Sequence, residues 1–178
     1  MQVFGRFFTW AVDSETKGEL DLLKKVLLFK GLSKQVLRKL LVDLYRKGYE
    51  AGETIFSEGE NGQAVYILLD GSVTIVKATP SGNKVLARLG PGSYFGELAL
   101  IDQSPRFATA LAEEKTDLLI MYKSYFDDLL TGNKSVSSRI LLNLVESLSR
   151  YIMINRRLEG EGLAEEKPAS GDSAKDAS

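Results

Sequence analysis

The middle of the chain holds a glycine, a carboxylate and a guanidinium close together in sequence: Gly96, Glu97 and Arg106. An arginine can make a bidentate, charge-assisted contact to the oxygens of an anion. An ionised carboxylate can only accept hydrogen bonds, so Glu97 suits a hydroxyl group next to that anion. Gly96 lets the backbone approach a ligand closely, and the GELALI segment is expected to form a short helix whose first N–H groups also favour an anion. These residues indicate a binding site for an anion that has a hydroxyl group close to it.

Each of these residues also has an ordinary structural interpretation. Glu97 would then only complement the dipole of a first helical turn. Arg106 would be a surface arginine that follows the QSP turn. The spacing of the two residues, together with the strands expected on both sides of them, favours the ligand site over these alternatives.

Composition excludes several kinds of chemistry. The sequence of 178 residues contains no cysteine and no histidine, which removes disulfides, thiol nucleophiles, Cys/His metal sites and histidine-based catalysis. Lys and Arg (23) nearly balance Asp and Glu (24), so non-specific binding to nucleic acid is not expected. No motif places a second carboxylate opposite Glu97. We therefore expect a protein that is not an enzyme and needs no metal, and the absence of cysteine is compatible with a cytoplasmic protein.

The elements that must position these residues are expected to be mainly β with flanking helices, arranged as an antiparallel β-roll, or jelly roll. Short runs with an apolar period of two, such as AVYILL, alternate with turn signals between Glu50 and Met121. Leucines at helical spacing precede them, and Ser33 is the expected N-cap of a second helix that closes at Lys47-Gly48. The expected divisions are an apolar extension (1–18) and a domain over 19–158 with helices (19–48), roll (50–122) and C-terminal helices (124–158), then a disordered tail (159–178).

Three segments carry a resemblance to a known family. FGELAL at Phe95–Leu100, with Arg106 beyond it, resembles the phosphate-binding cassette of cyclic nucleotide-binding domains. LFKGLS at Leu28–Ser33 resembles the helical lead-in of that family, and AGETIFSEGENGQAVYILLDGSV at Ala51–Val73 resembles its first strands. The family includes the catabolite activator protein, the regulatory subunits of cyclic-AMP-dependent kinase and the cyclic-nucleotide-gated channels. The similarity extends from about Leu20 to Leu158.

The resemblance implies a role for each residue of the candidate site. Gly96 and Glu97 would contact the ribose, Arg106 would bind the phosphate, and the backbone at Ala99 and Phe107 would add further contacts. Leu98 would pack the cassette against the roll, with Leu100 and Ile101. The complete expected set of ligand-binding residues is Gly96, Glu97, Leu98, Ala99, Arg106, Phe107, Ala108 and Tyr151.

Phe107 departs from the family pattern, in which a small residue usually follows the arginine. A hydroxyl at this position often accompanies recognition of guanine, and Phe107 has none, so the sequence favours cyclic AMP over cyclic GMP. The backbone N–H survives the change. The ring must turn away from the pocket, line it or partly fill it, and packing of the ring into the core of the roll is an equal alternative.

The last helix is expected to carry the output. Its apolar residues recur at alternating spacings of three and four, which is typical of a coiled-coil seam with one polar position. In the family that the sequence resembles, this helix swings over the base and, in the transcription factors, pairs two subunits. The resemblance therefore implies that the seam pairs two subunits and that Tyr151 or Arg150 reaches the base as a lid. Packing of the same stripe on the roll is the alternative. The seam residues are Leu141, Leu144, Leu148, Tyr151, Asn155 and Leu158.

The sequence therefore predicts a stand-alone sensor that relays binding of a cyclic nucleotide to an unknown protein partner or to a homodimer. A transcription factor would need a helix-turn-helix domain after the long helix, where we expect only a polar tail and so no nucleic-acid binding. The alternative is a degenerate roll that binds a protein or another ligand. The aromatic segment before Val12 lacks a basic face and the pattern of a signal peptide, so packing on the roll is favoured over a partner or a membrane surface.

Overall fold

The computed structural model describes residues 17–98 and 104–165, with side chains described as far as Arg150 and at Ile152 and Met153. The chain divides into two compact units, Met1–Leu144 and Val145–Ser178. The first unit contains the sheets and the expected site residues other than Tyr151. The second unit contains Tyr151 and the remainder of the last helix.

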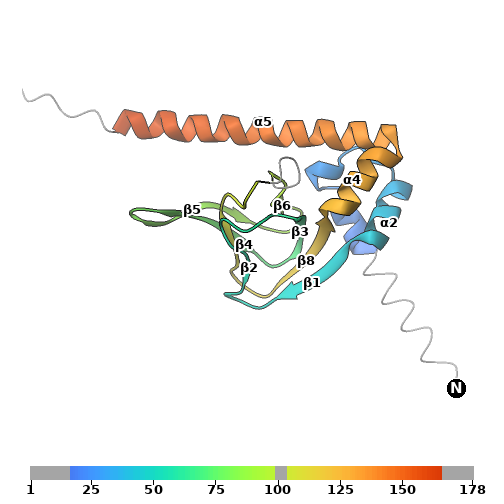
Figure 1. The fold of residues 1–178 in the computed structure, drawn as a ribbon, viewed down its shortest axis with the longest axis horizontal. Helices are drawn as coiled ribbons and strands as arrows, with labels where there is room; N and C mark the ends of the chain where they lie inside the picture. Colours follow the sequence, from blue (N-terminus) through green and yellow to red (C-terminus); the bar gives the residue numbers. More distant parts are fainter. Residues whose placement is uncertain (1–16, 99–103, 166–178) are drawn as a thin grey trace, which may run out of the picture. The chain divides into compact units, whose positions relative to one another are not determined.

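Eight antiparallel strands form two four-stranded sheets in the described part of the chain (Figure 1). This arrangement confirms the antiparallel jelly roll expected from the period-two pattern. In one sheet the strands follow the order β1 (Tyr45–Tyr49), β8 (Thr116–Tyr122), β3 (Ala64–Asp70) and β6 (Tyr94–Phe95). In the other the order is β2 (Thr54–Phe56), β7 (Thr109–Ala112), β4 (Val73–Thr79) and β5 (Gly82–Leu89).

The helices of the first unit gather at one side of the roll (Figure 1). Residues 17–23 are largely helical and are followed by the short helix η1 (Leu27–Phe29) and by α2 (Lys34–Asp43). The Ser33 hydroxyl accepts a hydrogen bond from the Val36 N–H at 3.3 Å, which confirms the expected N-cap. After the last strand come α4 (Lys123–Gly132) and the start of α5 (Lys134–Glu165).

The prediction that helical structure extends to Gly48 is wrong. Helix α2 ends at Asp43, and the next residues form strand β1, which pairs with β8 from Tyr45↔Ile120 to Tyr49↔Thr116. Leu44 has the spacing of a helical stripe, but its backbone is extended. Pairing with a strand some seventy residues later in the chain overrides this local pattern, because sheet formation depends on tertiary partners more than on propensity.

Two apolar clusters hold this arrangement together. The first joins the helices to β3 and β8, and it includes Phe29, Leu37, Ile67, Met121 and Ile140. The second lies between the two sheets. Its buried members are Tyr49, Ile55, Phe56, Leu68, Val73, Phe95, Ala110, Ala112 and Leu118. The candidate site borders this second cluster, because Phe95 directly precedes Gly96 and Glu97.

The first turns of α5 are tied to the helical lead-in. Ile140 and Leu144 are buried in the first cluster. The side chain of Asn143 is also buried, and its Nδ2 donates to the carbonyls of Leu28 at 3.0 Å and Lys30 at 2.8 Å. These bonds connect the base of the last helix to η1, which the resemblance had assigned to the helical lead-in.

Helix α5 ends at Glu165, so the expected tail that starts at residue 159 is wrong for residues 159–165. The remaining tail, 166–178, and the greater part of the apolar extension, 1–16, lie outside the described residues. No helix in the described part of the chain combines the length and the hydropathy that crossing a bilayer would require.

Candidate functional site

The guanidinium of Arg106 lies inside the roll. The residue is only 6% exposed, so the interpretation as an ordinary surface arginine is wrong. Nη1 donates to the Gly96 carbonyl at 2.7 Å, and Nη2 donates to the Ala64 carbonyl at 2.8 Å. Arg106 therefore links the start of β3 to the segment that follows β6.

Aromatic rings form the wall against which this guanidinium packs. Its central carbon lies 4.1 Å from the ring centroid of Phe56 and 5.5 Å from that of Tyr66. The Tyr66 and Phe95 rings are stacked with centroids 5.4 Å apart, so the three aromatics form one group. Burial lowers the pKa of the Arg106 guanidinium, while the neighbouring Tyr66 acts in the opposite direction. The result is a desolvated positive charge, held by carbonyls and aromatic faces.

Gly96 is required by the position of this arginine. Its φ is +79°, a conformation that residues with a Cβ rarely adopt. A Cβ added at this position would lie 2.6 Å from Nη1 of Arg106. Backbone conformation and the close approach of the arginine ten residues later therefore both select glycine here.

Glu97 follows directly and is half-buried beside the same charge. Burial raises the pKa of its carboxyl, whereas its own backbone N–H and Arg106 act to lower it. Leu98 is helical and at the surface. Residues 99–103 lie outside the described residues, so the short cassette helix and the contact expected from Ala99 stay predictions.

The backbone on both sides of Arg106 is fixed by a neighbouring loop, residues 57–61. The N–H of Arg106 donates to the Glu60 carbonyl at 2.7 Å, and the N–H of Gly59 donates to the Arg106 carbonyl at 2.9 Å. An isolated bridge pairs Asn61 with Pro105. The arginine is thus positioned by main-chain bonds as well as by its side chain.

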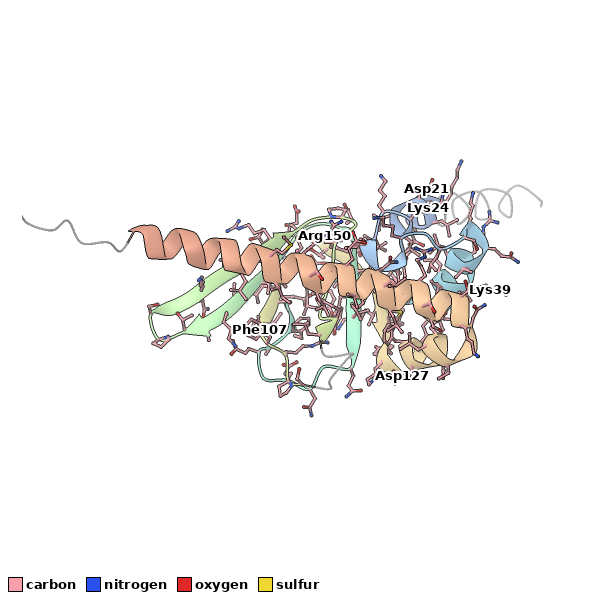
Figure 2. All side chains as sticks on the ribbon, turned by 90° about the horizontal axis from the view of Figure 1, so that it is seen from above. Asp21, Lys24, Lys39, Phe107, Asp127 and Arg150 are labelled. Atoms are coloured by element: carbon pink, nitrogen blue, oxygen red, sulfur yellow. The ribbon has the colours of Figure 1, made fainter. Side chains whose placement is uncertain are left out.

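Phe107 lies at the surface of the roll, apart from the labelled residues of α2 and α4 (Figure 2). It is 53% exposed, so the alternative that its ring is part of the core is wrong. The Lys77 Nζ lies 4.3 Å from the ring centroid and donates to the Phe107 carbonyl at 2.7 Å. The next residue, Ala108, is buried. The side chain of Tyr151 lies outside the described residues, so its role as a lid stays a prediction.

The structure brings Gly96, Glu97 and Arg106 together as expected, and it adds residues that sequence reasoning missed. These are Phe56 and Tyr66, whose rings pack on the guanidinium, and the carbonyl of Ala64. The aromatics lie in strand-like segments, where a core residue and a site residue give the same alternating pattern. The carbonyl belongs to the backbone, so no residue type marks it.

Comparisons with known proteins identify the same region. Residues 46–133 match the family described as "Cyclic nucleotide-binding domain". A cyclic AMP receptor protein of Thermus thermophilus is 38% identical over 97 residues, which cover 54% of this chain and 45% of the relative. A cAMP-dependent protein kinase regulatory subunit of Mycosarcoma maydis is 38% identical over 95 residues, which cover 53% of this chain and 18% of the relative. The chain thus spans less than half the length of either relative.

One solved structure is similar to this chain over most of its own length. It is a cyclic nucleotide-binding-like protein from Brucella abortus, with 30% identity and a TM-score of 0.54. The match covers 61% of this chain and 93% of that chain. Together with the buried Arg106 and its neighbours, these findings show that the chain belongs to the cyclic nucleotide-binding domain family.

Proposed function

We propose that this domain binds cyclic AMP inside the roll and relays binding through its last helix. Arg106 would bind the phosphate, and Glu97 would accept a hydrogen bond from the ribose 2′-hydroxyl. The observation that carries this proposal is the position of Arg106, which is buried between the Gly96 and Ala64 carbonyls beside Glu97.

The buried charge itself favours an anionic ligand. A guanidinium has five N–H donors, and the two carbonyls of Gly96 and Ala64 each accept one of them. Burial of the charge is unfavourable for the protein alone, as the lowered pKa of Arg106 indicates. A phosphate monoanion would supply both a compensating charge and acceptors for the remaining donors. Glu97 supplies only part of this compensation, because burial raises the pKa of its own carboxyl.

The choice of adenine is supported by the names of the relatives and by Phe107. Both curated relatives described above are named for cyclic AMP. Phe107 offers no hydroxyl to a guanine base. The direct test is a calorimetric titration of the protein with cyclic AMP, cyclic GMP and a cyclic dinucleotide. We expect a binding heat with cyclic AMP that is lost in Arg106→Ala. No heat at millimolar cyclic AMP would contradict the proposal and favour a roll that binds a protein or another ligand.

Replacing Phe107 with alanine is expected to change the affinity for cyclic AMP, the ratio of the cyclic AMP and cyclic GMP affinities, or both. The ring follows the phosphate-binding arginine and is half-exposed, so its removal opens space next to the ligand. Calorimetry with both nucleotides measures the effect. Replacement of Tyr45, a similarly exposed aromatic on strand β1, is the matched control and should leave both affinities unchanged. Unchanged affinities in Phe107→Ala would mean that the ring neither limits the affinity nor selects the base.

We propose that ligand binding in the roll is relayed through α5 to a protein partner or to a second copy of the chain. Its base is tied to η1 by Asn143, and Ile140 and Leu144 are buried in the first cluster. Leu144 is therefore committed to packing within its own unit, which shortens the expected coiled-coil seam at its start. Leu141 and Leu142, in the part of α5 that belongs to the first unit, are exposed apolar residues available for a partner or a second copy.

We expect the protein to dimerise, or to interchange between monomer and dimer, with a balance that shifts when cyclic AMP binds. A ligand can shift this balance only if it binds the two states with different affinity. Asn155 lies at a seam position where a buried asparagine specifies register at a cost in stability, so Asn155→Leu should strengthen association and favour higher oligomers. Sedimentation of both proteins with and without ligand measures this. If wild type and Asn155→Leu both stay monomeric at high concentration, with and without cyclic AMP, the seam only packs within its own chain.

A further inference from the structure

We propose that Lys77 and Glu58 are positioning residues for phosphate recognition: their ion pair fixes the backbone of Arg106 and Phe107 so that it presents its donors to the ligand. The inference rests on the proposed function and extends it to two residues that the sequence did not single out. Neither residue is expected to touch the phosphate. Their contribution is the placement of the segment that does.

Lys77 lies where the pairing between β4 and β7 ends. The last pair of this ladder is Val76↔Thr109, so the chain before Thr109 has no backbone partner on β4. Beyond this pair, the side chain of Lys77 connects β4 to this segment, because its Nζ donates to the Phe107 carbonyl at 2.7 Å. The same Nζ lies 4.3 Å from the centre of the Phe107 ring, which keeps the ring on the lysine side of the segment.

Glu58 connects this lysine to the loop 57–61. One carboxylate oxygen of Glu58 accepts from the Lys77 Nζ at 2.6 Å, and the other accepts from the Ala78 N–H at 3.1 Å. The N–H of Glu58 donates to the Thr109 hydroxyl at 2.9 Å. Both side chains are less than one third exposed, 28% for Lys77 and 30% for Glu58, so water competes with the pair only in part.

The consequence is a closed frame around the phosphate-binding segment. The loop 57–61 bonds to both backbone groups of Arg106 through Glu60 and Gly59. Glu58 ties the same loop to β4, and Lys77 ties β4 to Phe107. The N–H and the carbonyl of Arg106 and the carbonyl of Phe107 are thereby all hydrogen-bonded. The N–H of Phe107 has no acceptor among the described residues. This N–H is the donor that a phosphate oxygen can take.

An ordinary surface ion pair is the competing interpretation. Such a pair contributes little to stability and nothing to ligand binding. Two features argue against it here. Both partners make further bonds to the main chain, with the Phe107 carbonyl and the Ala78 N–H. The lysine also contacts the aromatic ring that sets this chain apart from the family pattern.

The experiment compares wild type, Lys77→Met, Lys77→Arg and Glu58→Gln by calorimetry with cyclic AMP and with its Rp and Sp phosphorothioates. Sulfur accepts hydrogen bonds poorly, so the ratio of the two thio affinities reports how the donors face each phosphate oxygen. Lys84→Met is the matched control, because Lys84 lies opposite Lys77 on β5 and is exposed. Thermal denaturation without ligand shows whether each variant is folded at the temperature of the titration.

We expect Lys77→Met to weaken cyclic AMP binding by about five- to thirtyfold. It should also move the ratio of the Rp and Sp phosphorothioate affinities, here called the thio ratio, toward one. Lys77→Arg should restore both values to within about threefold of wild type, because it keeps the charge and the donors. Glu58→Gln should have an intermediate effect, and Lys84→Met none. If wild type binds while Lys77→Met keeps its affinity and thio ratio, the positioning role is wrong and the proposed function stands. If wild type binds no cyclic nucleotide, both are wrong.

Discussion

Replacing Arg106 with alanine is expected to weaken cyclic AMP binding by roughly ten- to a hundredfold and to lower the free energy of unfolding by about 1–3 kcal/mol. The first effect follows from losing a charge-assisted contact to the phosphate. The second follows from the structure alone, because the side chain is buried and donates to the carbonyls of Gly96 and Ala64. Removing a partner from a buried polar group costs more than the bond contributes.

The two effects of Arg106→Ala separate by measurement. Chemical denaturation without ligand gives the change in stability, and calorimetry on the folded variant gives the change in affinity. Arg106→Lys keeps the positive charge and should recover part of the affinity, but a single ammonium lacks the planar fork that serves both carbonyls and the phosphate. Arg88→Ala is the control, since Arg88 is a largely exposed arginine on β5 that pairs with Glu113. An unchanged affinity in Arg106→Ala would exclude Arg106 as the phosphate anchor.

Replacing Gly96 with alanine is expected to lower the free energy of unfolding by about 2–4 kcal/mol and to weaken cyclic AMP binding. The φ of +79° disfavours any residue with a Cβ. In addition, the new Cβ would lie 2.6 Å from Nη1 of Arg106, so the guanidinium must move away from the Gly96 carbonyl. A displaced guanidinium no longer meets the phosphate in the same geometry, which links the stability effect to binding.

Gly52→Ala provides a matched control for backbone strain. Gly52 has a nearly identical φ of +83°, but an added Cβ would meet no atom within 4 Å. This variant should therefore show the cost of the conformation alone, about 1 kcal/mol, and bind cyclic AMP as wild type does. Denaturation and calorimetry of the two variants in parallel give the comparison. If Gly96→Ala and Gly52→Ala lose the same stability and both bind cyclic AMP as wild type does, the close approach of Arg106 to Gly96 has no role in the site.

Local patterns in the sequence were sufficient for the general architecture. The period-two runs between Glu50 and Met121 predicted the strands of the roll, since alternation places one face of each strand in the core. Ser33 marked the start of α2 because its hydroxyl can accept from a first-turn N–H. These signals depend on neighbours in the chain, so they can be read without knowing the tertiary structure.

The same local patterns failed where a distant segment decides the outcome. The leucine spacing continued through Leu44 and predicted a helix, but the backbone after Asp43 pairs with β8. The end of α5 was placed too early for a related reason. The charged and glycine-containing residues 159–165 lack a core-facing pattern, yet they continue the helix. Composition alone does not reveal whether a neighbouring element extends into such a segment.

By itself the sequence determined the types of group in the site, namely a glycine, a carboxylate and an arginine at a spacing that brings them together. Only the tertiary structure decided how they are held. The sheet register places the Ala64 carbonyl, Phe56 and Tyr66 around the guanidinium, and it ends the β4–β7 ladder where Lys77 can reach Phe107. Register is set by the pairing of strands far apart in the chain, and a shift of one residue would turn each of these side chains to the opposite face.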